Sequence, residues 1–223
     1  MFAGDVIEDA RDWSPAFSRD RFPDGLLLRR LGRIIEDLFA RAVVLNPDAL
    51  AVHEPEIVEH STITSALESR TPVEVPAFLT PIRAIYRFAD GRGVSPVACV
   101  TTTQATNRLC PFPAVVPLEA ALRFVDLRDF GSKRSGWEDE GQLEFYYVPR
   151  PRAPTALKGE QGTLAAPEWM RGKISAELAL WMAGRTGTVP PGLKDAAALA
   201  EEAFVGTVIA QQAGSSWYVQ LGA

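Results

Sequence analysis

The segment from Gly25 to Asn46 limits the possible folds of this chain more than any other feature. Apolar residues recur there every three or four positions, as they do on one face of an α-helix. These residues are Leu27, Leu28, Leu31, Ile34, Ile35, Leu38, Phe39 and Ala42. Asp24 is the expected N-cap, and the helix should end at Asn46 because a residue before proline avoids the helical conformation. A helix with one apolar face is not stable alone in water, so other segments must cover it.

Helical patterns also occur near both ends of the chain. The N-terminal pattern covers Asp5–Trp13. A second begins at Pro167, which suits a first helical turn, and should end at Gly184 or Gly187. A third runs from Leu193 to Gly214 after a proline-rich break. These segments are the candidates for covering the long helix.

The middle of the chain, 51–152, is rich in proline and in β-branched residues, which favours strands. The strand candidates are Glu56–Thr64, Pro81–Phe88, Val94–Thr101, Leu122–Leu127 and Leu143–Val148. Asp90-Gly91 suits a tight turn, so the second and third candidates should form a hairpin. The polar segment Gly131–Gly141 is expected to be an exposed loop.

Helices, then strands, then helices is an order that predicts an α+β protein and argues against a parallel doubly wound sheet. We expect a helical bundle formed by the N- and C-terminal helices, from residues 1–50 and 163–214. The central region 51–152 would be an inserted small β-sandwich or barrel-like region. Residues 153–162 would be a connector, and residues 215–223 a C-terminal tail.

Composition excludes several classes of function. The chain has 223 residues, with 23 basic and 28 acidic side chains and a formal net charge of −5, which disfavours tight DNA binding. No apolar run is long enough to cross a membrane, and the acidic N-terminus does not look like a signal peptide, so we expect synthesis in the cytoplasm. Cys99 and Cys110 are expected to be reduced, packed thiols.

No catalytic or metal-binding pattern emerges from the sequence. His53 and His60 do not have the spacing of a metal pair, and neither a nucleophile elbow nor a phosphate-binding loop is present. Adjacent carboxylates such as Glu201-Glu202 point in different directions on a helix, so they do not form acid–base pairs. We therefore expect no catalytic residue, no metal, no cofactor and no enzymatic activity.

Two sets of residues are candidates for partner binding. Arg29, Arg30 and Arg33 lie on the polar side of the long helix, where they form either a solvated face or a face that docks on an acidic partner. Trp217 and Tyr218 follow the last helix, and these residue types are frequent interface anchors. Packing of that pair onto the core of its own chain is the alternative.

The N-terminal motifs occur in a recognisable order: Ala10-Arg11, Asp24, Leu27-Leu28 and Pro47-Asp48-Ala49. In this order they resemble the head-to-tail adaptor (neck, or connector) proteins of tailed bacteriophages. The sequences VEVPAFLTPIRAIYRF and LEFYYVPRP look similar to that family's strands, and APEWMRGKISAELALWMAG to its returning helix. The long helix departs from the pattern by about one extra turn and by an apolar centre, Gly32-Arg33-Ile34-Ile35.

The resemblance implies a structural virion protein of the neck. Such a protein would form a homo-oligomeric ring of about twelve copies that joins the portal protein to a tail or stopper protein, through a heterologous contact that closes. DNA would pass the lumen without specific binding. A cellular protein-interaction module and an enzyme with a dispersed, unrecognised site are the alternatives.

Overall fold

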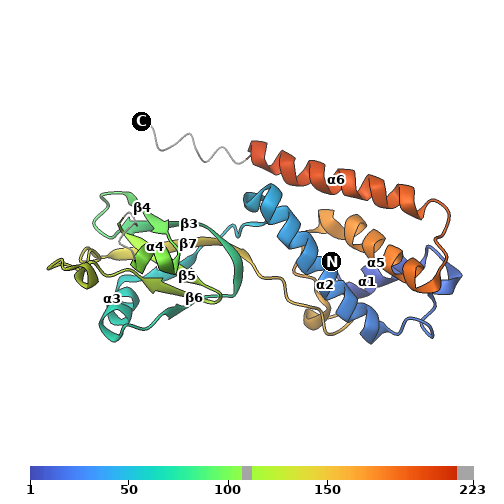
Figure 1. Cartoon of the computed structure of the whole chain (residues 1–223), viewed down its shortest axis with the longest axis horizontal. Helices are drawn as coiled ribbons and strands as arrows, with labels where there is room; N and C mark the ends of the chain where they lie inside the picture. The colour runs from blue at the N-terminus through green and yellow to red at the C-terminus, as the bar shows by residue number, and fades with distance from the viewer. Residues whose placement is uncertain (107–111, 215–223) are drawn as a thin grey trace. The chain divides into compact units, whose positions relative to one another are not determined.

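The computed structural model describes residues 1–106 and 112–214, and the chain divides into two compact units. The first, here called the helical unit, combines Met1–Ala49 with the chain from Pro151 onward, and the second, the sheet unit, is Leu50–Arg150. Figure 1 labels helices and strands of both units. The mixed α+β class predicted from the sequence is confirmed.

Four α-helices form the helical unit: α1 (Ala3–Arg11), α2 (Asp24–Leu45), α5 (Arg171–Thr186) and α6 (Leu193–Gly214). Helix α5 contacts each of the other three, and α2 also contacts α1 and α6. The whole apolar stripe predicted for α2 is buried. These contacts supply the cover that the stripe requires.

Several helix ends differ from the predicted ones. Helix α1 begins at Ala3 and ends at Arg11, not at Asp5 and Trp13, and α5 begins at Arg171, after a short 3-10 helix that Pro167 precedes. Asp24 is the first residue of α2 and not its cap, which is Pro23. The Asp24 carboxylate therefore lies in the first turn, where the helix dipole favours a negative charge. Helix α5 ends, as predicted, at Gly187, which has φ of 76° and is the kind of left-handed position that glycine tolerates.

The segment that follows Arg150 packs closely on two helices of its own unit. The amide of Gly4 in α1 donates to the Leu157 carbonyl at 2.9 Å. A Cβ atom on Gly32 of α2 would lie only 2.7 Å from the Cβ of Ala153. The glycine at the centre of the long helix is explained by this close approach.

The sheet unit contains a curled sheet with strand order β1-β7-β3-β4-β5-β6-β2. Its strands are β1 (Glu56–Glu59), β2 (Val73–Glu74), β3 (Phe78–Phe88), β4 (Val94–Cys99), β5 (Ala114–Leu118), β6 (Ala121–Phe124) and β7 (Gly141–Pro149). All neighbours are antiparallel except β4 and β5. The hairpin predicted for the second and third strand candidates is confirmed as β3–β4.

Helices α3 (His60–Ser69) and α4 (Thr102–Thr106) complete this unit. The prediction of one strand over Glu56–Thr64 is wrong after Glu59, because α3 begins at His60. Its buried residues Ile63, Ala66 and Leu67 have helical spacing. Since α3 contacts both edge strands, β1 and β2, the sheet curls around it.

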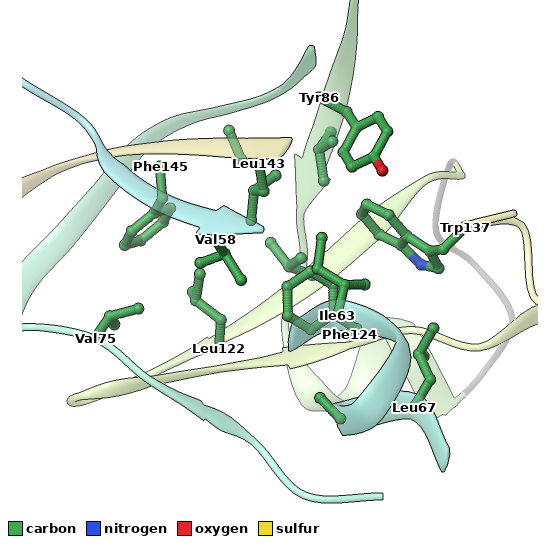
Figure 2. Close-up of a cluster of buried hydrophobic side chains, with 14 of the residues drawn as sticks. Val58, Ile63, Leu67, Val75, Tyr86, Leu122, Phe124, Trp137, Leu143 and Phe145 are labelled. Carbon is green, nitrogen blue, oxygen red and sulfur yellow. The ribbon is translucent and has the colours of Figure 1, made fainter. Parts of the chain in front are cut away.

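The core of the sheet unit combines aliphatic side chains with a group of buried aromatic ones (Figure 2). Trp137 is only 3% exposed, so the prediction that Gly131–Gly141 is an exposed loop is wrong at this residue. Its ring meets those of Phe124 and Tyr86 edge-on, with centroids 5.1 and 5.5 Å away. Its indole N–H donates to the Val125 carbonyl at 3.0 Å, which satisfies the only polar atom of the side chain.

Candidate partner-binding surface

The three arginines predicted for partner binding lie on α2 but have different surroundings. Arg29 and Arg33 are exposed, and neither has an ion pair or a hydrogen bond within residues 1–106 and 112–214. Arg30 is half-buried, and its guanidinium lies over the Trp181 ring, 5.9 Å from the centroid. The structure thus separates two free cations from one that packs on its own chain.

A second arginine, which belongs to α5 itself, also lies over the ring of Trp181. The Arg185 guanidinium lies 5.4 Å from the ring centroid, and Phe22 meets the ring edge-on at 6.0 Å. The Nε of Arg30 is buried and has no hydrogen-bond partner in the described chain, so the cation–π contact is what holds this group. The half-buried Arg30 and Trp181 and the exposed Arg185 therefore form a cationic cluster in the helical unit.

The motif residues Arg11 and Asp24, which are far apart in the sequence pattern, are direct partners. An Nη atom of Arg11 donates to the Asp24 carboxylate at 2.7 Å and to the Phe22 carbonyl at 2.9 Å. The other Nη donates to Glu8 at 2.8 Å, and the Arg11 side chain is 8% exposed. This buried arginine fixes the end of α1 against the start of α2, a pairing that the sequence reasoning did not predict.

Helix α6 is held in the unit by a buried cation on α5. The Lys173 ammonium lies 2.7 Å from Glu201 of α6 and 2.6 Å from Glu177, and its side chain is only 5% exposed. The hydrogen bond from Lys173 lowers the pKa of Glu201, against the effect of burial, and Arg41 of α2 adds to it. One carboxylate thus connects α2, α5 and α6, which fixes the orientation of α6.

The face of α6 that points away from these contacts is apolar and exposed. Leu199 is 66% exposed and Ile209 is 50% exposed. The small residues Ala203, Gly206 and Ala210 share this outer side and are exposed as well. Sequence reasoning missed this surface, although the signal was present: α6 is apolar nearly all round, which is typical of a helix buried on two sides.

A cavity of about 460 Å³ lies in the sheet unit between α3, α4 and the end of β6. Its lining includes Leu67, Phe124, Phe130, Arg70, Asp126 and Asp129. Burial raises the pKa of Asp126, but hydrogen bonds from Arg128 outweigh it and leave the pKa below its ordinary value. Asp129 is 3.3 Å from Arg70. Asp126 is thus held as an ionised acceptor, which does not suit a general acid, and Asp129 is paired with a cation.

The histidines and the described cysteine are not arranged for catalysis. The Tyr86 hydroxyl donates to the Asp139 carbonyl at 2.7 Å, so His60 Nδ1, 2.9 Å away, must be the donor in its own contact with that oxygen. Cys99 is a free thiol, but it is exposed, so the prediction that it is packed is wrong. Partial desolvation by neighbouring atoms still raises its pKa to about 11, which makes it a poor nucleophile at neutral pH. His53 is exposed.

Other predicted site features lie elsewhere. No group of three or more His, Cys, Asp or Glu side chains that suits a metal ion occurs in the part of the chain that the structure describes. Trp217, Tyr218 and Cys110 lie outside the described residues. None of the helices in the described segments has both the length and the apolarity needed to cross a membrane.

Comparisons with known proteins add no family to this description. No protein-family model matches the chain, and no curated protein matches it either.

Proposed function

We propose that this protein is a structural subunit of the neck of a tailed bacteriophage, a head-to-tail adaptor that joins the portal protein to a tail or stopper protein. In this proposal it has no enzymatic activity and no cofactor. It acts as a homo-oligomeric ring, and DNA passes the lumen without specific binding. The N- and C-terminal helices would form the bundle of the ring body, with the sheet unit inserted in it.

The observation that carries the proposal is the contact between the motif residues that resemble the adaptor family. Arg11 donates to Asp24. The motif residues that adjoin these two in the sequence, Ala10, Leu27 and Leu28, are buried. Direct contact between two motif residues that are thirteen positions apart fits a fold signature better than a chance succession of short matches. The exposed apolar side of α6 also supports a subunit role, since exposed apolar patches often mark contacts between proteins.

The cavity in the sheet unit is the feature that favours the alternative of an enzyme with a dispersed site. Its volume of about 460 Å³ is in the range of small-molecule sites. Its carboxylates are paired with arginines, however, and an active site needs convergent polar groups that remain available to a substrate. We therefore rank the structural role first.

Electron microscopy of the purified protein, combined with sedimentation velocity, tests the proposal. A neck adaptor should give hollow rings of uniform diameter and a single large species. A protein that stays monomeric at its highest soluble concentration, and also when mixed with a phage portal protein, would contradict the adaptor role and leave a cellular interaction module as the better reading.

A further inference from the structure

The outer side of α6 is unpartnered although the helix is firmly held. Its inner side carries Leu193, Phe204 and Val208, all at most 2% exposed. Its outer side carries Leu199 and Ile209, which are among the most exposed large apolar residues of the described chain. A helix that is apolar on both sides is typical of one that packs between two layers, and within the described residues both helix neighbours of α6, α2 and α5, contact its inner side.

Spacing on this outer side suits a second helix. Leu199, Ala203, Gly206 and Ala210 follow each other at intervals of four, three and four residues. That alternation keeps side chains in line along a straight contact with another helix. Gly206 leaves open space, since nothing lies within 4 Å of the position that a Cβ would take there. The backbone of a second helix can therefore approach closely.

The charges on the outer side of α6 are complementary to those on another exposed helix face, the outer side of α2. Asp195 and Glu202 are exposed on the N-terminal half of α6 and have no ion-pair partner within the described segments. Arg29 and Arg33 are the unpaired cations on the N-terminal half of α2. Further along each helix the outer faces become apolar, with Ala40 and Val44 on α2 and Ile209 and Ala210 on α6, and Val44 is 85% exposed.

We propose that the outer side of α6 docks on the outer side of α2 of a second copy of this chain, with the two helices parallel. The outer side of α2 comprises Arg29, Arg33, Glu36, Asp37, Ala40 and Val44, all exposed. The outer side of α6 comprises Asp195, Leu199, Glu202, Ala203, Gly206, Ile209 and Ala210, likewise exposed. This inference rests on the proposed function and names the surfaces between neighbouring copies.

One register satisfies both the charges and the apolar residues. Placing Arg33 opposite Glu202 also places Ala40 opposite Ile209, since each is seven residues further along its helix. The acidic pair Glu36 and Asp37 then faces the Val205–Gly206 step and not another carboxylate. Arg29 lies about one turn from Asp195, within the reach of an arginine side chain.

The contact inside one chain sets the direction. Arg41 pairs with Glu201, and Asn46 Nδ2 donates to the Val208 carbonyl at 2.9 Å, so residue numbers rise in the same direction on α2 and α6. A second α2 on the other side of α6 would repeat this parallel packing. Because the two docking surfaces differ, the contact is heterologous, and repeating it adds copies in one direction until a ring closes.

Two variants test the inference, each altering one surface at exposed positions. Leu199→Glu/Ile209→Glu alters α6, and Arg29→Glu/Arg33→Glu alters α2. Val189→Glu, at a 42% exposed apolar position before α6, is the control for the first. Arg21→Glu/Arg152→Glu, at exposed arginines outside α2, is the control for the second and makes the same charge change. Circular dichroism establishes that all four remain folded.

Sedimentation velocity should show each surface variant as a monomer, at concentrations about tenfold above those where the wild type and both controls assemble. Mixing the two surface variants in equal amounts should produce a dimer, because each still carries the surface that the other lacks. Assembly of either surface variant like wild type, or absence of the dimer from the mixture, overturns the inference. If wild type forms rings while these results fail, the adaptor role stands and only the surfaces are wrong; if wild type never assembles, both fall.

Discussion

The two units of this protein reach a stable core by different routes. The helical unit is built from chain segments on both sides of the sheet unit, whereas the sheet unit is the continuous stretch Leu50–Arg150. Charged pairs join helices from the two flanking segments, with Asp9 of α1 on Arg171 of α5 and Arg41 of α2 on Glu201 of α6. Stacked and edge-on aromatic rings fill the sheet unit.

The way each unit is connected along the chain explains which interactions hold it together. Helices that are distant in sequence have few local constraints on their relative placement, and a charged hydrogen bond fixes distance and direction at once. Strands are already placed by their hydrogen-bond register, so their core needs volume more than direction. We infer that the sheet unit depends on packing volume and the helical unit on specific pairs in addition to packing.

Removal of the central aromatic of the sheet unit should have the largest effect. Trp137→Ala deletes a ring that contacts Phe124 and Tyr86 and leaves the Val125 carbonyl without its donor. We expect a loss of about 3–5 kcal/mol from the free energy of unfolding of this unit. Hydrogen exchange by mass spectrometry should show faster exchange within 50–150 and unchanged protection in α1 and α5.

The control for this prediction is Trp137→Phe, which keeps most of the ring volume but loses the hydrogen bond. It should cost clearly less than the alanine variant. Equal acceleration of exchange in both units would mean that they unfold together, and the contrast drawn between them would then be wrong.

Removal of one apolar residue from α2 should destabilise the helical unit, by an amount similar to or smaller than the loss expected in the sheet unit. Leu31 is fully buried, so Leu31→Ala should cost about 2–5 kcal/mol in urea unfolding. Leu26→Ala, at a half-buried position one turn earlier, is the matched control and should cost less. A change within experimental error at Leu31 would contradict the assignment of the buried face of α2.

A charge variant sharpens the claim that specific pairs hold the helices. Glu201→Gln removes the carboxylate shared by Lys173 and Arg41, while Lys173 keeps Glu177. Because Glu201 is about a third exposed and its main partner is not left alone, we expect a loss of about 1–2 kcal/mol at pH 7. Glu202→Gln, at the adjacent unpaired residue, should change stability by less than about 0.5 kcal/mol.

The pH dependence gives an independent check on this pair. The pKa of Glu201 is lower in the folded protein than its ordinary value of 4.5, so the unfolded chain binds the proton first on acidification. Its contribution is complete above about pH 4.5 and is lost as the pH falls through the folded pKa. The stability difference between wild type and Glu201→Gln should therefore shrink below about pH 4.5. A difference that stays constant down to pH 3 would argue against the pair.

Sequence patterns predicted the elements whose periodicity is long and uninterrupted. Helix α2 and helix α6 have clear apolar positions over 22 residues each, and their existence followed from spacing alone. The strand prediction for Glu56–Thr64 extends wrongly into the first half of α3 because Thr62, Ile63 and Thr64 are β-branched, and local propensity is a weak guide where tertiary contacts decide. The spacing of Ile63, Ala66 and Leu67 was the signal for a helix.

Other features depend on contacts that no local pattern contains. Strand β5 was not predicted, because Pro113 and Pro117 flank its apolar pair and proline is a poor strand residue. Trp137 stands in a polar segment, and its burial depends on β6 and β3. For the candidate surface, the sequence placed Arg29, Arg30 and Arg33 on one side of α2, but only the structure separates Arg30, which packs on Trp181.

The smallest expected effect on stability concerns residues 215–223, whose Trp217 and Tyr218 lie outside the described residues. Deletion after Gly214 should leave the unfolding temperature of the monomer nearly unchanged, because Val208 is the last buried residue of α6 among those whose side chains the structure describes. The same deletion should block incorporation into the neck, since aromatic pairs of this kind act as interface anchors whose burial must outweigh the entropy lost on ordering.

Both properties, the unfolding temperature and incorporation into the neck, are to be measured on one truncated protein. Trp217→Ala/Tyr218→Ala in the full chain is the control that separates the effect of the rings from that of the length of the tail. Unfolding of the truncated monomer would assign the tail to the core of its own chain, and infectious particles assembled from truncated subunits would show that the tail is no essential anchor.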